Sequence, residues 1–175
     1  MRREDHFITT YTLSLYFYTF LFNYSLLLTF VLSFFTAYLS WLPDIDIKVL
    51  KKLDKLRKEK KIIYFLFFPL IFLLRLFFKH RTFTHTFWIP FSLILLDLFV
   101  LDNGFLKLIV RIFYMSLLLH ILEDSLTKTG VRPFYPEKFT LKIPIFSTND
   151  DFHSFLIKMI SLVLLALYFL LIFKN

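Results

Sequence analysis

The stretch FWIPFSLILLDLFVLDNGFLKLIVRIFYMSLLLHILED, residues 87–124, decides the fold class. It contains two apolar runs, 87–101 and 105–122, which are separated only by Asp102, Asn103 and Gly104. These three residues favour a tight turn, so we expect the two runs to form an antiparallel helical hairpin. Their unbroken Leu, Phe and Ile content, without alternation of apolar and polar residues, favours membrane-spanning helices over a barrel.

The composition of the whole chain indicates the same class. Of 175 residues, 58% are hydrophobic and 26 are phenylalanine, which is more apolar surface than a soluble core of this size can bury. We therefore predict an all-α, polytopic helical membrane protein, with one domain over residues 1–175. The chain contains no cysteine, so any metal ion would be held by nitrogen and oxygen ligands.

The N-terminal apolar run, residues 7–42, is too long for one ordinary crossing, because about 20 residues span a bilayer as a helix. Asn23 lies near its middle, which favours two helices over residues 7–21 and 24–41. A single long, tilted helix is the alternative. No small-residue cleavage site follows the run, so we expect a retained anchor and not a removed signal peptide.

Two further apolar runs cover residues 62–78 and 155–173. We therefore expect about five transmembrane helices and one interfacial or re-entrant segment. The 62–78 run is the weakest candidate to span, since it contains Pro69 and Arg75. If it lies at the interface or re-enters, all candidate site residues fall on one membrane face. If it spans, the bilayer separates them into two groups.

The distribution of basic residues favours the first choice. The loops at 22–24 and 102–104 contain no Lys or Arg, whereas the loops on the other side are rich in both, and the positive-inside rule then places the candidate site in the cytoplasm. The Lys-rich stretch at 48–61 is expected to lie against anionic membrane lipids, and nucleic-acid binding is not expected. The basic residues on the site face are Arg2, Arg3, Lys48, Lys51, Lys52, Lys55, Arg57, Lys58, Lys60, Lys61, Lys79, Arg81, Lys128, Arg132, Lys138 and Lys142.

Carboxylates and imidazoles cluster at the ends of the apolar runs. His120 and Asp124 are four residues apart, so a helix places them on one face within reach of one metal ion. Asp44 and Asp46 follow Pro43, which ends the preceding helix, and in extended backbone both carboxylates would point the same way. Such groups are ligands for zinc, manganese or magnesium.

The third cluster contains His80 and His85, which would diverge on a continuous helix. They converge only if the chain turns between them, and Thr82 or Thr84 as a helix N-cap would supply that turn. Arg81 is a candidate to bind an anionic oxygen of a substrate, because guanidinium matches phosphate geometry.

Each cluster has a simpler interpretation when it is taken alone. The His120/Asp124 pair could be a hydrogen bond, and the carboxylates at 44 and 46 could flank a loop beside Lys48. Three clusters on one predicted face favour a shared site. Asp97 lies inside an apolar run and has a candidate partner in Arg111, and this pair could instead mark the path of a transporter.

Three ordered motifs carry a resemblance to a known family. They are LPDID at 42–46, HRTFTHT at 80–86 and HILEDSLTKTGV at 120–131. The chain resembles the YdjM-like family of inner-membrane, metal-dependent hydrolases, also called LexA-regulated membrane-bound hydrolases. The matching positions are Pro43, Asp44, Asp46, His80, Arg81, Thr84, His85, His120, Asp124, Thr127 and Gly130, followed by Pro133-Phe134 or Pro136 as the turn.

The chain departs from the family pattern at both ends. His6 stands where members often have a Thr-His pair, but the Thr is missing. Near the C-terminus, residues 148–153 correspond to a Thr-Gly-Ser-x-x-Glu-like stretch, so His153 or Asp151 would replace the family's carboxylate. The metal ligands that the resemblance implies are His6, Asp44, Asp46, His80, His85, His120, Asp124 and His153.

The family is similar in motif style to zinc-dependent phospholipase C and P1-type nucleases. The resemblance implies a hydrolase that acts on an anionic phosphoester, such as a phospholipid head group, with a divalent metal ion, zinc or alternatively manganese. Asp44 or Asp124 would act as general base and Arg81 would neutralise the phosphoryl charge. The alternative is a non-catalytic metal-binding membrane protein or a transporter. The sequence leaves the oligomeric state open.

Overall fold

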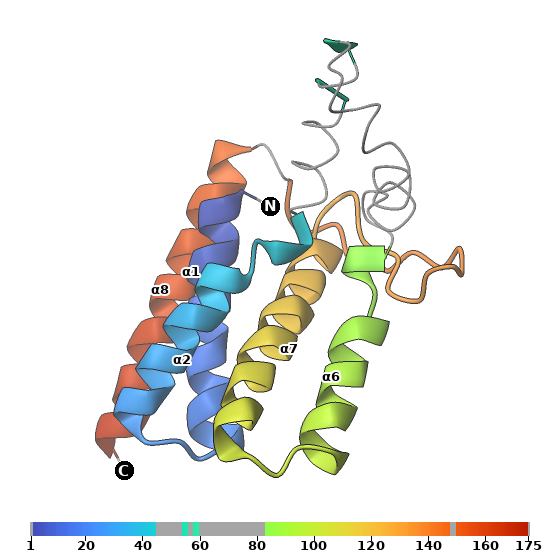
Figure 1. The fold of residues 1–175 in the computed structure, drawn as a ribbon. Coiled ribbons are helices and arrows are strands. Elements are labelled where there is room, and N and C mark those ends of the chain that lie inside the picture. Colours follow the sequence, from blue (N-terminus) through green and yellow to red (C-terminus); the bar gives the residue numbers. More distant parts are fainter. Residues whose placement is uncertain (1, 45–53, 56–57, 60–82, 148–149, 175) are drawn as a thin grey trace.

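The computed structural model describes residues 2–44, 54–55, 58–59, 83–147 and 150–174. In this part of the chain, five α-helices stand side by side in one bundle (Figure 1). α1 lies among α2, α7 and α8, and α6 packs against α7 at the edge of the bundle. The prediction of an all-α fold is confirmed.

The N-terminal apolar run forms two helices, as the position of Asn23 predicts. α1 (Arg3–Tyr16) continues into the π-helix η1 (Phe17–Leu21), and α2 (Leu26–Leu39) runs back to the short 3₁₀-helix η2 (Leu42–Asp44). Asn23 takes a positive φ of 52° in the turn, a conformation that asparagine tolerates better than most residues. α1 begins at Arg3, earlier than residue 7, so His6 lies in its first turns and not in a preceding loop.

The second hairpin also forms. α6 (Trp88–Phe99) and α7 (Gly104–Ser125) are joined by residues 100–103. The Asn103 side chain caps α7 by accepting hydrogen bonds from the backbone N–H groups of Phe105 and Leu106, at 2.9 and 3.2 Å. Arg111 of α7 donates a hydrogen bond from Nε to Asp97 Oδ2 of α6 at 2.9 Å, which confirms the expected pair.

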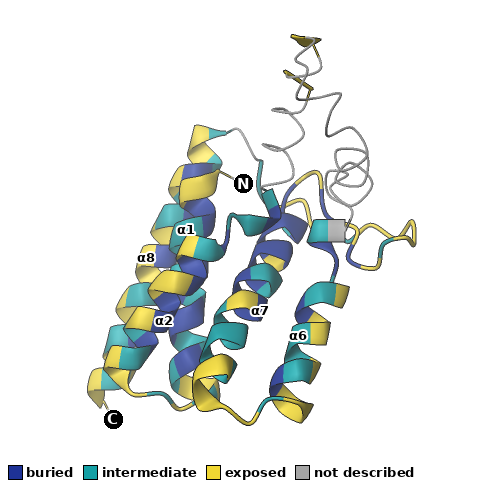
Figure 2. Cartoon of the chain, in the orientation of Figure 1, coloured by how far each residue is buried: buried dark blue, intermediate teal, exposed yellow. Residues whose placement is uncertain are grey.

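The last helix, α8 (Asp151–Lys174), starts at the same end of the bundle as α1. Figure 2 shows exposed residues along the outer side of α8 and buried residues toward the bundle interior. The buried positions of α1 are mainly polar, including Asp5, His6, Thr10, Thr12 and Ser14. This arrangement, with apolar side chains outside and polar side chains inside, suits a bundle surrounded by lipid.

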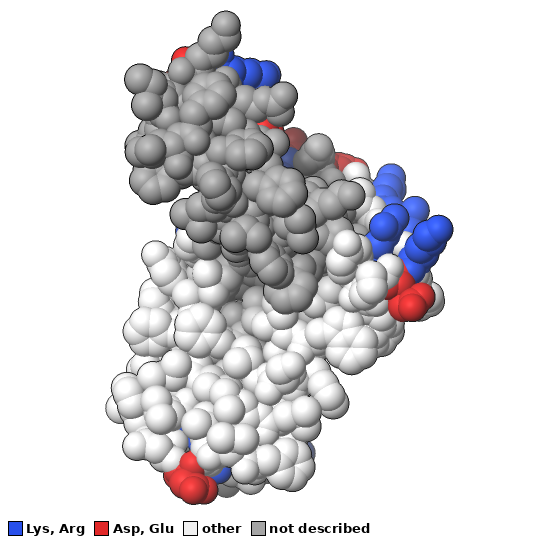
Figure 3. Space-filling view, turned by 45° about the vertical axis from the view of Figure 1, so that its right-hand side comes forward, with Lys and Arg blue, Asp and Glu red and all other residues white. Residues whose placement is uncertain are grey.

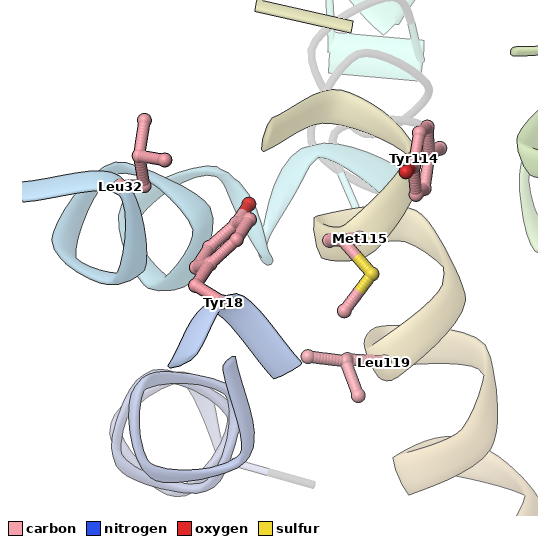
Figure 4. Close-up of a cluster of buried hydrophobic side chains, with 5 residues drawn as sticks. All are labelled: Tyr18, Leu32, Tyr114, Met115 and Leu119. Carbon is pink, nitrogen blue, oxygen red and sulfur yellow. The ribbon is translucent and has the colours of Figure 1, made fainter. Parts of the chain in front are cut away.

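The apolar core lies where η1, α2 and α7 meet. Figure 4 shows Tyr18, Leu32, Tyr114, Met115 and Leu119 gathered there, and all five side chains are buried. Tyr18 also hydrogen-bonds Thr36 at 2.7 Å between the two hydroxyl oxygens. This core holds α2 and α7 side by side and so fixes the relative position of their ends.

Three segments of the described chain are long and apolar enough to cross a membrane: Leu26–Asp44, Gly104–Ser125 and Asp151–Lys174. α6 has 12 residues and a length of about 18 Å, which is shorter than the hydrocarbon core of about 30 Å. Five crossings therefore stay a prediction. The 62–78 run, expected at the interface, lies outside the described residues.

One end of the bundle collects the start of α1, η2, the end of α7 and the start of α8 (Figure 1). The chain leaves this end at Asp44 and is back at it in the 3₁₀-helix η3 (Phe83–His85). Residues 127–147 connect α7 to α8 there, and two isolated bridges order them, Thr127 with Phe146 and Val131 with Leu141. The expectation that the candidate residues Asp44, His85, His120 and Asp124 share one end therefore agrees with the fold.

Candidate metal centre

Four of the predicted ligands come together at this end of the bundle. Asp44 ends η2, His85 ends η3, and His120 and Asp124 lie one turn apart near the end of α7. One ligand atom from each residue lies within 4.8 Å of the other three. We call these four residues the Asp/His group.

The distances within the Asp/His group suit one divalent ion. The Nε2 atoms of His85 and His120 are 3.3 Å apart, and both are 3.7 Å from Asp124 Oδ2. Asp44 Oδ1 is 3.7 Å from His85 Nε2 and 3.9 Å from His120 Nε2. Four ligands around zinc at bond lengths of about 2.1 Å would be separated by roughly 3.4 Å, so a tetrahedral N₂O₂ site needs only small inward shifts.

Burial differs sharply within the group. The side chains of His85 and His120 are 0% exposed and that of Asp124 is 2% exposed, whereas Asp44 is 33% exposed. Burying carboxylates among imidazoles is costly unless a cation neutralises them. The group therefore fits a metal ion chemically as well as in its spacing, and Asp44 lies on its accessible side.

His6 of α1 lies beside the Asp/His group. Its ring stacks on that of His120, with the ring centroids 4.3 Å apart. Its Nδ1 is 2.5 Å from Glu123 Oε2, and Thr10 donates a hydrogen bond to the other oxygen of Glu123 at 2.9 Å. Glu123 thus fixes the orientation of the His6 ring, as carboxylates do for metal-binding histidines.

The other ring nitrogen of His6 points at Asp124. His6 Nε2 is 3.3 Å from Asp124 Oδ1, and this buried nitrogen has no hydrogen-bond partner among the described residues. The two oxygens of Asp124 therefore face different sets of nitrogens, Oδ2 toward His85 and His120 and Oδ1 toward His6. A carboxylate in this position can bridge two ions.

The His85 ring is held by its neighbour in sequence. The Thr84 hydroxyl oxygen lies 2.9 Å from His85 Nδ1, which leaves Nε2 directed at the other ligands. Thr84 does not cap α6 as predicted: it lies within η3, and the N-cap residue of α6 is Phe87, which makes no side-chain cap bond. The described part of the chain before His85 is the 3₁₀-helix η3, and Thr82, the other candidate N-cap, lies outside the described residues.

The other motif residues position the end of α7. Thr127 donates a hydrogen bond to the Asp124 carbonyl at 2.7 Å. Gly130 has φ of 65°, and a Cβ there would lie 2.6 Å from the Leu141 carbonyl oxygen, so only glycine fits. The Pro133 carbonyl accepts a hydrogen bond from the Phe87 N–H at 2.8 Å, which ties the 127–147 connection to the segment that follows His85.

The structure does not bring His153 to the Asp/His group. His153 Nδ1 lies 2.6 Å from Asp150 Oδ2 at the start of α8, so Asp150 holds the ring there. This hydrogen bond lowers the pKa of Asp150 below its usual value. Asp151, the other candidate for the last ligand, is exposed and pairs with Arg2. Neither residue belongs to the group of four ligands in this arrangement.

Three predicted site residues, Asp46, His80 and Arg81, lie outside the described residues, so their roles stay predictions. Sequence reasoning missed Glu123, which binds His6 across a separation of 117 residues. The available signal was its place beside Asp124 in the HILED motif, three residues after His120. It also missed Asp5, which accepts a hydrogen bond from Ser154 at 2.6 Å and joins α1 to α8.

The family model described as YdjM inner membrane protein matches residues 1–175. No curated protein and no solved structure matches the chain.

Proposed function

The chain belongs to the YdjM family of inner membrane proteins, and from this premise we propose that it is a membrane-embedded, metal-dependent hydrolase of phosphoesters. The observation that carries the proposal is the Asp/His group, in which two carboxylates and two imidazoles converge within 4.8 Å. A bound divalent ion would supply a water of lowered pKa and polarise a phosphoryl oxygen. We expect zinc, with manganese as the alternative, because both accept N and O ligands.

The roles that we assign to the residues of the Asp/His group follow from their burial. His85, His120 and Asp124 are buried and would hold the ion, whereas Asp44 is one-third exposed. Asp44 can therefore reach a water on the accessible side and accept its proton as general base, with Asp124 as the second candidate for that role. Arg81 is assigned to the phosphoryl oxygens on the basis of the motif alone.

His6 supports a second ion next to the first. A ligand atom bound to one ion at about 2.1 Å would lie roughly 3.4 Å from its tetrahedral neighbour, and the separation of His6 Nε2 from Asp124 Oδ1 is 3.3 Å. Two ions held by these residues would stabilise both the attacking and the leaving oxygen of a phosphoester. Glu123 would act as the positioning residue for His6.

The location of the site favours a lipid substrate. The Asp/His group lies at the ends of helices long enough to span, which is the level of lipid head groups. The loops at the opposite end, 22–24 and 102–104, contain no Lys or Arg, so we assign the site to the cytoplasmic face. An anionic phosphoester in a phospholipid head group is the proposed substrate.

A non-catalytic metal site is the second candidate function. Four protein ligands around one ion are typical of structural zinc, whereas catalytic zinc keeps a position open for water. The N₂O₂ set of the Asp/His group would close the coordination shell if Asp44 stayed bound throughout. The Asp97/Arg111 pair also leaves open a transporter, because intramembrane charges often mark ion paths.

The test is turnover by metal-loaded protein in mixed micelles of phospholipid and detergent, with release of the phosphorylated head group as the readout. The variants His85→Ala and Asp124→Asn should lose both metal and turnover. Asp102→Asn removes a carboxylate from the exposed turn at the other end and should retain both. Metal-loaded wild-type protein that cleaves none of the phosphoesters would contradict hydrolysis, and metal-ion movement in vesicles would then favour the transporter.

A further inference from the structure

Outside the Asp/His group, the connection between α7 and α8 presents an unusual surface. Its residues 132–145, which we call the 132–145 loop, expose the apolar side chains of Phe134, Phe139, Ile143 and Ile145 to between 43% and 56%. Trp88, at the start of α6, is 52% exposed. Adjacent apolar side chains of this size normally contact a partner or a membrane.

The loop is held in a fixed position against α6. Trp88 donates a hydrogen bond from Nε1 to the Tyr135 carbonyl at 3.2 Å. The Phe134 ring packs edge-on against Trp88, with the ring centroids 6.2 Å apart, and also contacts Phe139. Backbone hydrogen bonds of 3.0 and 2.9 Å between Val131 and Leu141 close the base of the loop. The aromatic surface is therefore preformed.

Exposed basic side chains lie on the same connection as these aromatic rings. Between residues 126 and 147, four exposed basic residues face one exposed acidic residue, Glu137, which leaves a net charge of +3. Figure 3 shows basic side chains gathered at the upper right edge, above a largely uncharged helix body. Aromatic rings mixed with lysine and arginine are typical of the layer where acyl chains meet anionic head groups. The basic residues are Lys128, Arg132, Lys138 and Lys142.

The lengths of α6 and α7 give the depth of Trp88 below the end of α7. Both helices meet the 100–103 turn, but α7 is about 33 Å long and α6 about 18 Å, given their 22 and 12 residues. Trp88 therefore lies about 15 Å short of the level where α7 ends. In a hydrocarbon core of about 30 Å, a depth of about 15 Å puts Trp88 well inside the acyl-chain region. The 132–145 loop is bonded to Trp88 at Tyr135 and closed at its base by Val131 and Leu141, so it runs between this depth and the end of α7.

We propose that the 132–145 loop and Trp88 form a lipid-binding surface for anionic phospholipids. The Phe134 and Phe139 rings enter the acyl-chain boundary, and Lys138 and Lys142 bind the lipid phosphates. The bond from Phe87 to the Pro133 carbonyl links this surface to the segment that carries His85, so a docked loop also steadies one side of the metal centre. This binding does not require the proposed hydrolase activity.

The chain provides its own reporter, since it contains only two tryptophans, Trp41 and Trp88. A Trp41→Phe variant leaves Trp88 as the only indole and keeps an aromatic ring at position 41. The full chain would be reconstituted into bilayers of phosphatidylcholine that contain increasing amounts of brominated phosphatidylglycerol or brominated phosphatidylcholine. Quenching of Trp88 fluorescence gives the relative affinity of the two lipids for this surface.

We expect brominated lipid to quench Trp88 strongly, aqueous iodide to quench it weakly, and phosphatidylglycerol to be preferred. In the same background, Lys138→Gln or Lys142→Gln should each lower this preference by about fivefold. Lys107→Gln removes the same charge near the opposite end and should leave the preference unchanged.

Three results would overturn the proposal. Quenching by iodide but not by lipid would mean that water covers the loop. Protection from both quenchers would mean that a polypeptide, such as a second copy of the chain, covers it. Equal affinity for both lipids, unaffected by the lysine variants, would remove the anionic specificity.

Discussion

The two ends of the helix bundle both bury charged side chains, but they differ in what neutralises the charge. At the end with the 22–25 and 100–103 turns, the Asp97 carboxylate has its own cation, Arg111, whose Nε lies 2.9 Å away. Arg111 also donates to the Tyr24 hydroxyl and lies over the Phe22 ring, 4.8 Å from its centroid. Tyr114 donates a further hydrogen bond to Asp97 at 3.4 Å.

At the other end, the ligand atoms of Asp44 and Asp124 lie within 4.8 Å of ring nitrogens of His85 and His120. Imidazole binds metal in its neutral form, so the Asp/His group then carries two negative charges in a largely buried place. Charged side chains that are buried to a similar extent therefore serve different purposes at the two ends. The Asp97/Arg111 pair contains its own counter-charge and joins α6 to α7, whereas the Asp/His group gathers two carboxylates and two imidazoles, a set that suits a divalent cation.

The largest expected effect is on the amount of bound metal, which should depend on the Asp/His group and not on the Asp97/Arg111 pair. Asp124→Asn keeps the size of the side chain but removes the charge that faces His6, His85 and His120, so bound metal should fall from at least one ion per chain to nearly none. Elemental analysis of purified protein measures this. Asp97→Asn, the matched change at the other end, should retain the wild-type content, and equal loss in both variants would break the comparison.

The next effect is on stability. A metal ion that binds only the folded protein stabilises it by about 4 kcal/mol when its free concentration is a thousand times Kd. Chelation should therefore lower the thermal unfolding midpoint of the wild type. It should have little effect on Asp124→Asn, which has already lost the ion. A chelator that shifts both proteins equally would show that the shift does not come from this site.

At the opposite end, removing one partner should destabilise without any effect on metal. Asp97→Asn leaves the Arg111 guanidinium without its carboxylate and should cost about 3 kcal/mol, near the lower end for broken buried pairs because Arg111 is 20% exposed. Chemical unfolding in detergent measures the loss. Replacing both residues, as Asp97→Leu with Arg111→Met, should recover much of it. No recovery would indicate that the two side chains act independently.

The smallest effect concerns the orientation of His6. Glu123→Gln keeps the shape of the side chain but weakens its hold on His6 Nδ1, so metal affinity should fall by roughly 10- to 100-fold without complete loss of the site. Competition with a metal-binding dye gives the affinity. Thr9→Val, on α1 but bonded to the Asp5 carbonyl, is the control and should bind as wild type. An unchanged affinity in Glu123→Gln would exclude His6 from the metal centre.

Features set by local sequence could be predicted well. Asn23 and the Asp102-Asn103-Gly104 turn located both hairpins, and the spacing of His120 and Asp124 placed them on one face of α7. The Asp97/Arg111 pair followed from two charges in neighbouring apolar runs.

Features that depend on contacts between distant segments could not be predicted. The bond between His6 and Glu123 depends on how α1 packs against α7, and no local pattern encodes that packing. The early start of α1 at Arg3 was missed because charged residues looked like a flanking loop, although Glu4 and Asp5 suit a helix N-terminus. His153 was assigned to the metal by its place in the motif, whereas Asp150, three residues earlier, holds it at the start of α8.

The central claim is that the Asp/His group binds a divalent metal ion, and X-ray absorption at the zinc edge of zinc-loaded protein tests it most directly. We predict a first shell of about four N and O atoms at roughly 2.0–2.1 Å, with the outer-shell scattering of at least two imidazoles. The Asp124→Asn variant should lose this spectrum and Asp97→Asn should retain it. A zinc spectrum without imidazole scattering, or one that Asp124→Asn leaves unchanged, would contradict the claim.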